Sequence, residues 1–170
     1  MSIQIQKIGI IGVGTMGAGI AQIAIQSGHD VVLFDAKAGA AEQAQEKLAK
    51  TLNTLADKGK FSHEKAAEDL AHLSIAQQIE DLKDCDLIVE AIIENLEIKQ
   101  KLMQQLEGIV KPEAILASNT SSLSISAIAA NCSQPERVAG YHFFNPVPLM
   151  KVVEVIEGFN TRADIVDALT

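Results

Sequence analysis

A glycine-rich segment near the N-terminus has the spacing of a phosphate-binding turn. Gly12, Gly14 and Gly17 form a GxGxxG pattern that follows an apolar run and precedes a helix-like segment. The first glycine permits a tight turn, the second lets backbone approach a pyrophosphate, and the third lets helix pack on strand. The helix start at Thr15 and Met16 adds free N–H groups and a positive dipole end. This pattern predicts a dinucleotide site; a turn that binds nothing, or a site for FAD or S-adenosylmethionine, is the alternative.

An acidic residue narrows the choice of dinucleotide. Asp35 lies eighteen residues beyond Gly17, at the end of the second expected strand. A carboxylate there accepts hydrogen bonds from the adenosine ribose and repels a 2′-phosphate, which favours NAD over NADP. Lys37 lies nearby and weakens this preference. NAD is therefore the predicted cofactor.

A histidine and a glutamate lie at mirror positions about a proline turn. Pro148 is six residues from both His142 and Glu154, so a hairpin centred on it brings the carboxylate beside the imidazole. Such a pair holds the ring in one tautomer and favours its protonated form, which suits a general base. A cross-strand hydrogen bond of purely structural use is the alternative. By spacing, no such partner is expected for the other histidines, His29, His63 and His72.

Polar side chains follow several expected strands and outline one crevice, because ligands in open α/β sheets bind beyond the carboxyl ends of the strands. These side chains belong to Asp35, Glu94, residues 119–122 and His142. Ser121 is expected to face the crevice, whereas Ser122 is as typical of a helix N-cap.

The helix expected after Asn95 contains two lysines with different expected partners. Glu97 and Lys101 are four residues apart, which predicts a surface ion pair. Lys99 has Asn95 and not an acid four residues before it, so it is free to reach toward a ligand. Asn95 is the expected N-cap, and the expected buried face consists of Ile98, Leu102, Leu106 and Ile109.

The segments that must position these residues alternate between strand-like and helix-like patterns, which predicts an α/β fold with a doubly wound, mostly parallel sheet. The expected strands are residues 7–12, 31–35, 73–76, 86–91, 114–118 and 138–143. A last strand at 151–156 returns antiparallel, because a tight turn cannot make a parallel crossover. The expected helices are residues 15–27, 95–109, 124–130 and a pair within 38–71 that is broken around residues 58–60.

Composition restricts the class of protein. The 170 residues, 48% of them apolar, suffice for one domain with a hydrophobic core. A net charge of −8 argues against binding to nucleic acid or an anionic membrane, because phosphate contacts need an excess of Lys and Arg.

The uncharged run 8–25 resembles a membrane span, but its five glycines favour strand, turn and helix. Cys85 and Cys132 fit neither a metal site nor a disulfide framework, so no metal and a cytoplasmic location are expected.

The end of the sequence predicts the start of one more helix. Thr161 followed by Asp164 has the spacing of a capping box with a shorter acid. The helix that follows would be about nine residues long, shorter than isolated helices tolerate. The sequence is therefore expected to be the first part of a longer chain.

Several blocks together resemble the L-3-hydroxyacyl-CoA dehydrogenase family. The matching blocks are GIIGVGTMGAGIAQIA at 9–24, Asp35, VEAIIENLEIK at 89–99, SNTSSL at 118–123 and HFFNPVPLMKVVE at 142–154. They span essentially the whole chain in order. The resemblance implies that residues 1–170 are a Rossmann-type NAD-binding domain with an inserted helical arm at about 38–71.

The resemblance also implies a reaction, the oxidation of a (3S)-3-hydroxyacyl-CoA to the 3-oxoacyl-CoA in fatty-acid metabolism, including β-oxidation. It implies that His142 is the general base, that Glu154 orients it, and that Ser121 bonds the substrate oxygen near the nicotinamide. It adds cofactor contacts for Glu94, Lys99 and Asn145. A related dehydrogenase of free hydroxy acids or sugar acids, and a non-catalytic NAD-binding module, are the alternatives.

The helical arm is less acidic than the rest of the chain. Residues 37–65 hold six lysines and four acids, whereas the remainder holds eight basic and eighteen acidic residues. Coenzyme A carries several phosphate charges, so the arm is a candidate to hold its nucleotide end. The family uses the arm in this way, and Thr51 and Lys58 loosely match its contact positions; a solvated helix face is the alternative. The resemblance further implies a C-terminal helical domain, absent from this sequence, that forms a homodimer and completes the substrate pocket.

Overall fold

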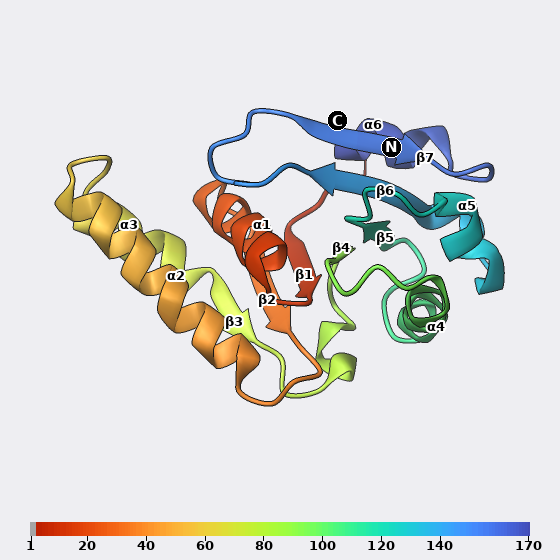
Figure 1. The fold of residues 1–170 in the computed structure, drawn as a ribbon, viewed down its shortest axis with the longest axis horizontal. Helices are drawn as coiled ribbons and strands as arrows, with labels where there is room; N and C mark the ends of the chain where they lie inside the picture. The colour runs from red at the N-terminus through yellow and green to blue at the C-terminus, as the bar shows by residue number, and fades with distance from the viewer. Residues whose placement is uncertain (1–2) are drawn as a thin grey trace.

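The computed structural model describes residues 3–170, which form one seven-stranded sheet with helices on both faces (Figure 1). The strand order is β3-β2-β1-β4-β5-β6-β7. The strands are β1 (Lys7–Ile11), β2 (Asp30–Phe34), β3 (Leu73–Ile75), β4 (Leu87–Glu90), β5 (Ile115–Ser118), β6 (Val138–Phe143) and β7 (Val153–Glu157). All neighbours are parallel except β6 and β7. The predicted doubly wound Rossmann-type sheet with a returning last strand is confirmed.

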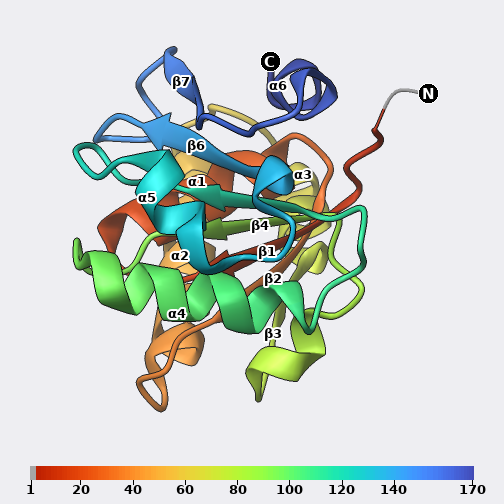
Figure 2. The ribbon, with the colours of Figure 1, turned by 90° about the vertical axis from the view of Figure 1, so that its right-hand side faces the viewer.

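The helices cover the two faces of the sheet unequally. One face carries α1 (Thr15–Gln26), α2 (Ala40–Asp57), α3 (His63–Ala71) and α6 (Ala163–Leu169). The other face, seen from the front in Figure 2, carries α4 (Leu96–Glu107) and the short α5 (Ile125–Ile128). Because the strand order turns from β1 to β4 at the centre, the crevice for a ligand lies beyond the carboxyl ends of these two strands.

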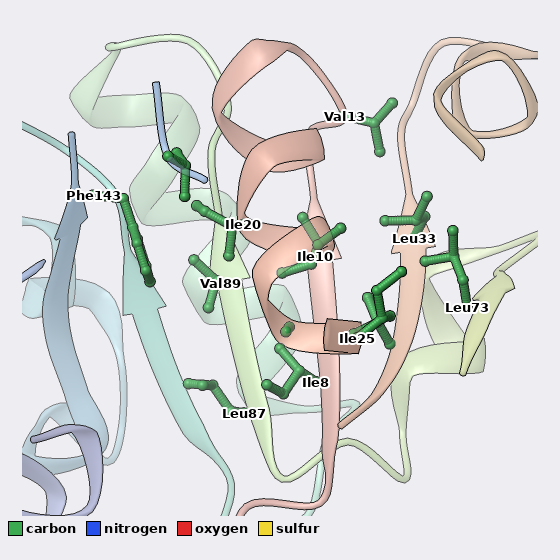
Figure 3. Close-up of a cluster of buried hydrophobic side chains, with 14 of the residues drawn as sticks. Ile8, Ile10, Val13, Ile20, Ile25, Leu33, Leu73, Leu87, Val89 and Phe143 are labelled. Carbon is green, nitrogen blue, oxygen red and sulfur yellow. The ribbon is translucent and has the colours of Figure 1, made fainter. Parts of the chain in front are cut away.

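The central strands are buried on both sides, which explains their continuous apolar sequences. Ile8 and Ile10 of β1 and Leu87 and Val89 of β4 belong to one cluster of buried side chains with Ile20 and Ile25 of α1 (Figure 3). The alternate positions face α4 instead, among them Ile11, Ile88 and Leu116. The uncharged run 8–25 is thus β1 followed by α1, and no helix within residues 3–170 has the length and apolar character to cross a membrane.

The helical arm consists of α2 and α3, which project from the side of the molecule away from α4 and α5 (Figure 1). The predicted break is confirmed: α2 ends at Asp57, and Gly59 adopts a φ of +73°, which favours glycine. Ser62 caps α3, since its side chain accepts a hydrogen bond of 3.1 Å from the N–H of Lys65.

The prediction for the buried face of α4 is right only in part: Leu106 is fully buried, and Leu102 and Ile109 are half-buried against the core. Asn95 caps the helix as expected, because its Oδ1 accepts from the N–H of Ile98 at 3.0 Å. Ile98, however, is 43% exposed. The fully buried residues of the helix are Lys99, Met103 and Leu106, so the buried face is rotated by about one position from the expected one.

The predicted capping box of α6 is also wrong. The Oγ1 of Thr161 accepts from the N–H of Gly158 at 2.8 Å and donates to the carbonyl of Val138 at 2.7 Å, so it fastens the loop to β6. The N-cap position belongs to Arg162, whose guanidinium pairs with Asp164 at 2.8 Å.

Candidate active site

The glycine-rich turn between β1 and α1 has the geometry that its spacing predicts. Gly12 has a φ of +89°, and a Cβ at Gly17 would lie 1.7 Å from the carbonyl oxygen of Gly12, so neither position accepts a side chain. A Cβ at Gly14 would meet nothing within 4 Å. Gly14 therefore borders open space, which leaves room for a ligand to approach the backbone.

The start of α1 offers unused hydrogen-bond donors. The first helical bond runs from the N–H of Ala18 to the carbonyl of Gly14 at 2.9 Å. Gly14 supplies no capping side chain, and no acceptor within residues 3–170 is recorded for the N–H groups of Thr15 and Met16. A pyrophosphate placed here would satisfy these donors and lie at the positive end of the helix dipole.

Asp35 is held beside this turn in one orientation. Its Oδ2 accepts from the N–H of Val13 at 3.0 Å, and its Oδ1 accepts from the N–H of Lys37 at 2.9 Å. Asp35 borders a cleft of about 430 Å³ whose walls are mostly apolar, formed by Ile11, Gly12, Phe34, Ala36, Ile79, Ile92, Ile98, Lys101, Leu102 and Gln105. A flat aromatic base fits such a cleft, with a ribose at the carboxylate. The exposed side chain of Ile98 forms part of one wall of this cleft.

A second cavity, of about 340 Å³, lies on the other side of the glycine-rich turn and brings together five of the predicted site residues, namely Met16, Glu94, Ser121, His142 and Asn145. It is lined by Met16, Ala91, Ile92, Glu94, Asn119, Ser121, His142, Phe143, Phe144 and Asn145. The cleft beside Asp35, named the adenosine cleft here for the group expected to bind in it, the glycine-rich turn and this cavity follow one another along the carboxyl edge of the sheet. The residues present thus fit an extended dinucleotide.

His142 and Glu154 are direct partners in the β6–β7 register. The Nδ1 atom of His142 lies 2.9 Å from Oε2 of Glu154, as the symmetric hairpin predicts. The ring also packs at 4.6 Å, centroid to centroid, against Phe144. Nε2 has no recorded partner within residues 3–170, so it is available to exchange a proton with a ligand.

The loop after β5 carries Ser121 into the cavity. Asn119 fastens the loop, because its Oδ1 accepts from the N–H of Phe143 at 2.9 Å. Thr120 Oγ1 donates to Oε2 of Glu94 at 2.6 Å. Ser121 lines the cavity without a recorded side-chain bond of its own in the described chain. Ser122 is not the helix N-cap; Ser124 caps α5, by accepting from the N–H of Ala127 at 3.3 Å.

Lys99 is not free, contrary to the prediction from its helix spacing. It is 1% exposed, and its Nζ lies 2.7 and 2.8 Å from the carboxylate oxygens of Glu90 and 3.2 Å from Oε1 of Glu94. Glu90 was not predicted as a site residue. Its signal in the sequence is a charged residue at the end of a buried apolar strand. The predicted Glu97–Lys101 ion pair is absent from the described residues, and Lys101 borders the adenosine cleft instead.

A third cavity, of about 560 Å³, lies between α1, α2 and the 145–148 turn. Thr51 lines it together with Gln22, Lys37, Gln43, Lys47 and Asn145. Lys58, the C-cap of α2, is not among the residues that line it. Of the two residues predicted to contact coenzyme A, the cavity therefore includes only Thr51.

Two other histidines do have carboxylate partners, which corrects the expectation from spacing. Nδ1 of His72 lies 2.7 Å from Asp30, and Nε2 of His63 lies 3.0 Å from Asp57. Both pairs lie outside the cavities described above.

Comparison with known proteins identifies the family. The family model described as "3-hydroxyacyl-CoA dehydrogenase, NAD binding domain" matches residues 7–170. The chain is 45% identical over 169 residues to the 3-hydroxyadipyl-CoA dehydrogenase of Escherichia coli K12, covering 99% of this chain and 36% of that protein. It is 47% identical over 165 residues to a probable 3-hydroxybutyryl-CoA dehydrogenase of Deinococcus radiodurans, covering 96% and 59%.

A solved structure supports the same assignment. The crystal structure of 3-hydroxybutyryl-CoA dehydrogenase from Escherichia coli K12 superposes with a TM-score of 0.95 at 44% identity, covering 98% of this chain and 35% of that one. The chain thus spans between about a third and three fifths of the length of these relatives. The chain therefore belongs to the NAD-binding domain family of the 3-hydroxyacyl-CoA dehydrogenases, and NAD is its cofactor.

Proposed function

We propose that this chain is the cofactor-binding part of an enzyme that oxidises (3S)-3-hydroxyacyl-CoA to 3-oxoacyl-CoA. The observation that carries the proposal is the cavity of about 340 Å³, where His142 and Ser121 lie at the end of a crevice that fits NAD. The reaction needs a base for the hydroxyl proton and an acceptor for the hydride on C3. The imidazole supplies the first, and bound NAD supplies the second.

In the proposed mechanism, Nε2 of His142 accepts the proton of the C3 hydroxyl as that group becomes a carbonyl. Glu154 holds the proton on Nδ1, so that Nε2 is the basic nitrogen, and its charge stabilises the imidazolium. Ser121 donates a hydrogen bond to the substrate oxygen and fixes its direction. In reduction, His142 returns the proton to the same oxygen.

The cofactor contacts follow from the order of the three parts of the crevice. The turn at Gly12, Gly14 and Gly17 binds the pyrophosphate together with the N–H groups that begin α1. Glu94, Asn145 and Met16 line the nicotinamide end. Lys99 acts on this end through Glu94, because its ammonium is directed to the two carboxylates.

The Asp35→Ala variant tests the adenosine end. Loss of the charged acceptor should weaken NADH binding about tenfold or more, since hydrogen bonds to charged groups contribute about 1.5–3 kcal/mol. NADPH binding should fall less, because the 2′-phosphate no longer meets a carboxylate. Fluorescence titration measures both dissociation constants, with Asp30→Asn at the opposite end of β2 as the control. An equal loss for the two nucleotides would contradict the ribose contact.

Coenzyme A is proposed to lie along the arm. The cavity of about 560 Å³ joins the 145–148 turn to α2, and Lys37 and Lys47 at its edge offer positive charge to phosphates. Thr51 lies further along the same wall, and Lys58 follows at the end of α2.

Reduction of acetoacetyl-CoA by the full-length protein tests the reaction itself. We expect NADH oxidation, followed by absorbance, that requires the thioester and is negligible with free acetoacetate at equal concentration. Equal rates with the free acid would favour a hydroxy-acid dehydrogenase. NADH binding without turnover of either compound would favour a non-catalytic module.

We further propose that a helical C-terminal domain covers the β6–β7 end of this domain and forms a homodimer. The support is a set of exposed apolar side chains there: Leu149, Met150, Val152, Val153 and Phe159. Residues 1–170 expressed alone should bind an apolar-surface dye or self-associate, and the full-length protein should not. A monomer of residues 1–170 that binds no dye would contradict this arrangement.

The free thiols Cys85 and Cys132 are consistent with a location in the reducing cytoplasm.

A further inference from the structure

Glu90 is a fully buried acid that the mechanism above does not use. It is the last residue of β4 and is 0% exposed. The alternation of the strand directs it to the face that carries α4, beside Ser118, its partner in the β4–β5 register. Its carboxylate accepts from the Lys99 ammonium at 2.7 and 2.8 Å, from the N–H of Ile92 at 3.1 Å, and from the Ser118 hydroxyl.

These contacts belong to a closed ring of polar groups beneath the cavity that contains His142. From Glu90 the ring passes to Lys99, whose Nζ lies 3.2 Å from Oε1 of Glu94. The other oxygen of Glu94 accepts from Thr120 Oγ1 at 2.6 Å. The N–H of Thr120 donates to Ser118 Oγ at 3.2 Å, and Ser118 returns to Glu90. The ring therefore joins the turn after β4 to the loop after β5.

Stability does not account for such a ring. The desolvation free energy of two buried charges is frequently as large as the free energy gained from their attraction. A pair of apolar side chains of similar volume would fill the same space without that cost. Burial raises the pKa of Glu90 even though Lys99, Ser118 and Ile92 donate to it, so the ionised form costs folding free energy near neutral pH. The benefit lies in geometry, because a fully hydrogen-bonded network specifies one arrangement of its members.

We propose that Glu90 and Lys99 are positioning residues for hydride transfer: through Glu94 and Thr120 they set the loop that carries Ser121 into the reaction cavity. Ser121 directly follows Thr120 and has no recorded side-chain bond within residues 3–170, so the ring supplies the constraint that its own side chain lacks. This inference rests on the proposed function, since it assigns Ser121 a place beside the substrate oxygen.

The central experiment compares two acid-to-amide substitutions at opposite ends of β4 in the full-length protein. Glu90→Gln removes the buried charge under the site. Asp86→Asn removes the charge from a more exposed ion pair, that with Lys111, far from the site. We expect Glu90→Gln to lower kcat for acetoacetyl-CoA reduction about 10- to 100-fold, because small misplacements in an active site have effects of this size. KM and the Kd of NADH should change less than about threefold.

A second readout separates positioning from general destabilisation. With NADH deuterated at the transferred position, the kinetic isotope effect on kcat should increase in Glu90→Gln, because hydride transfer becomes slower relative to the other steps. Asp86→Asn should keep kcat within about twofold of the unchanged protein, with the same isotope effect, whatever its melting temperature. The proposal is overturned if folded Glu90→Gln keeps its kcat, or if Asp86→Asn loses as much.

Thr120→Val removes the hydrogen bond between Thr120 and Glu94 and adds no buried charge. This variant tests the proposal if Glu90→Gln fails to fold. It should lower kcat several-fold with little change in KM, and an unchanged kcat would overturn the proposal. A double-mutant cycle of Glu90→Gln with Lys99→Met should be strongly non-additive, because both act through the same network.

A titration distinguishes failure of this inference from failure of the proposed function. Partial burial raises the pKa of Glu94, but the bond from Thr120 and the Lys99 ammonium outweigh burial and lower this pKa below its ordinary value. Lys99→Met should therefore raise the pKa of Glu94 in an NMR titration, and Asp86→Asn should leave it unchanged. If the protein reduces no 3-oxoacyl-CoA, the proposed function fails. An unmoved Glu94 pKa would overturn the ring in either case.

Discussion

Two histidine–carboxylate pairs in this chain have nearly the same geometry in different surroundings. Nδ1 of His142 lies 2.9 Å from Glu154, and Nδ1 of His72 lies 2.7 Å from Asp30. The side chain of His142 is 16% exposed and borders the cavity at the carboxyl edge of the sheet. His72 is 40% exposed and lies at the opposite edge, just before β3. The contact alone thus does not mark a reaction site; its position relative to the ligand-binding edge does.

The two pairs arise from different pieces of the fold. His142 and Glu154 face each other across an antiparallel hairpin, so their separation follows from a local turn. Asp30 begins β2, and His72 follows the last residue of α3. The carbonyl of His72 accepts from the N–H of Val31 at 2.8 Å. The His72 pair fastens the end of the helical arm to the sheet, which is a structural role.

The largest effect should come from His142→Gln. The amide cannot accept a proton, and general base catalysis contributes about 10²–10⁴-fold, so kcat of the full-length protein should fall by about 10³-fold. The Kd of NADH should stay within about threefold, which shows that the crevice is intact. If the kcat of His142→Gln stays within a few-fold of that of the unchanged protein, His142 is not the general base and its role does not differ from that of His72.

A smaller loss should follow from Glu154→Gln. The amide keeps a hydrogen bond to Nδ1 but loses the charge that stabilises the imidazolium, so kcat should fall by about 10- to 100-fold, within the range of general base catalysis. Steady-state kinetics with NADH and acetoacetyl-CoA measure it. If Glu154→Gln equals the unchanged protein, the His142 pair is as structural as the His72 pair.

The smallest effect should come from His72→Gln and Asp30→Asn. The pair is open to solvent, with side chains 40% and 65% exposed, so each substitution should change the free energy of unfolding by less than about 1 kcal/mol. Turnover should remain unchanged. Denaturant unfolding measures the free energy of unfolding, and the NADH assay measures turnover. A tenfold loss of kcat would show that the arm and the reaction cavity are coupled through this pair.

The parts of the site that follow from short segments could be predicted from the sequence. Gly12, Gly14 and Gly17 lie within one turn, where Gly12 and Gly17 exclude a side chain and Gly14 borders open space, as their spacing predicts. The pairing of His142 with Glu154 follows from their equal separation from Pro148 along the chain, because the loop of an antiparallel hairpin sets the register of its strands.

Predictions about the partners of individual side chains on other segments failed. Lys99 was expected to be free because only its own helix was considered, whereas its partner Glu90 lies on the strand before that helix. The buried face of α4 is rotated for the same reason, since Lys99 points inward to this acid and Ile98 outward to the adenosine cleft. His72 was expected to lack a partner because Asp30 is forty-two residues away.

The sequence by itself determined the order of the elements, the doubly wound sheet, the phosphate turn and the candidate base with its carboxylate. Periodicity, glycine sterics and turn length are local properties, and they act within a few residues. Only the tertiary structure decided which charged groups meet in the interior and which histidine pair lies at the ligand edge. Buried charges choose partners by proximity in space, where desolvation makes an unpaired charge costly, and spacing along the chain does not encode that proximity.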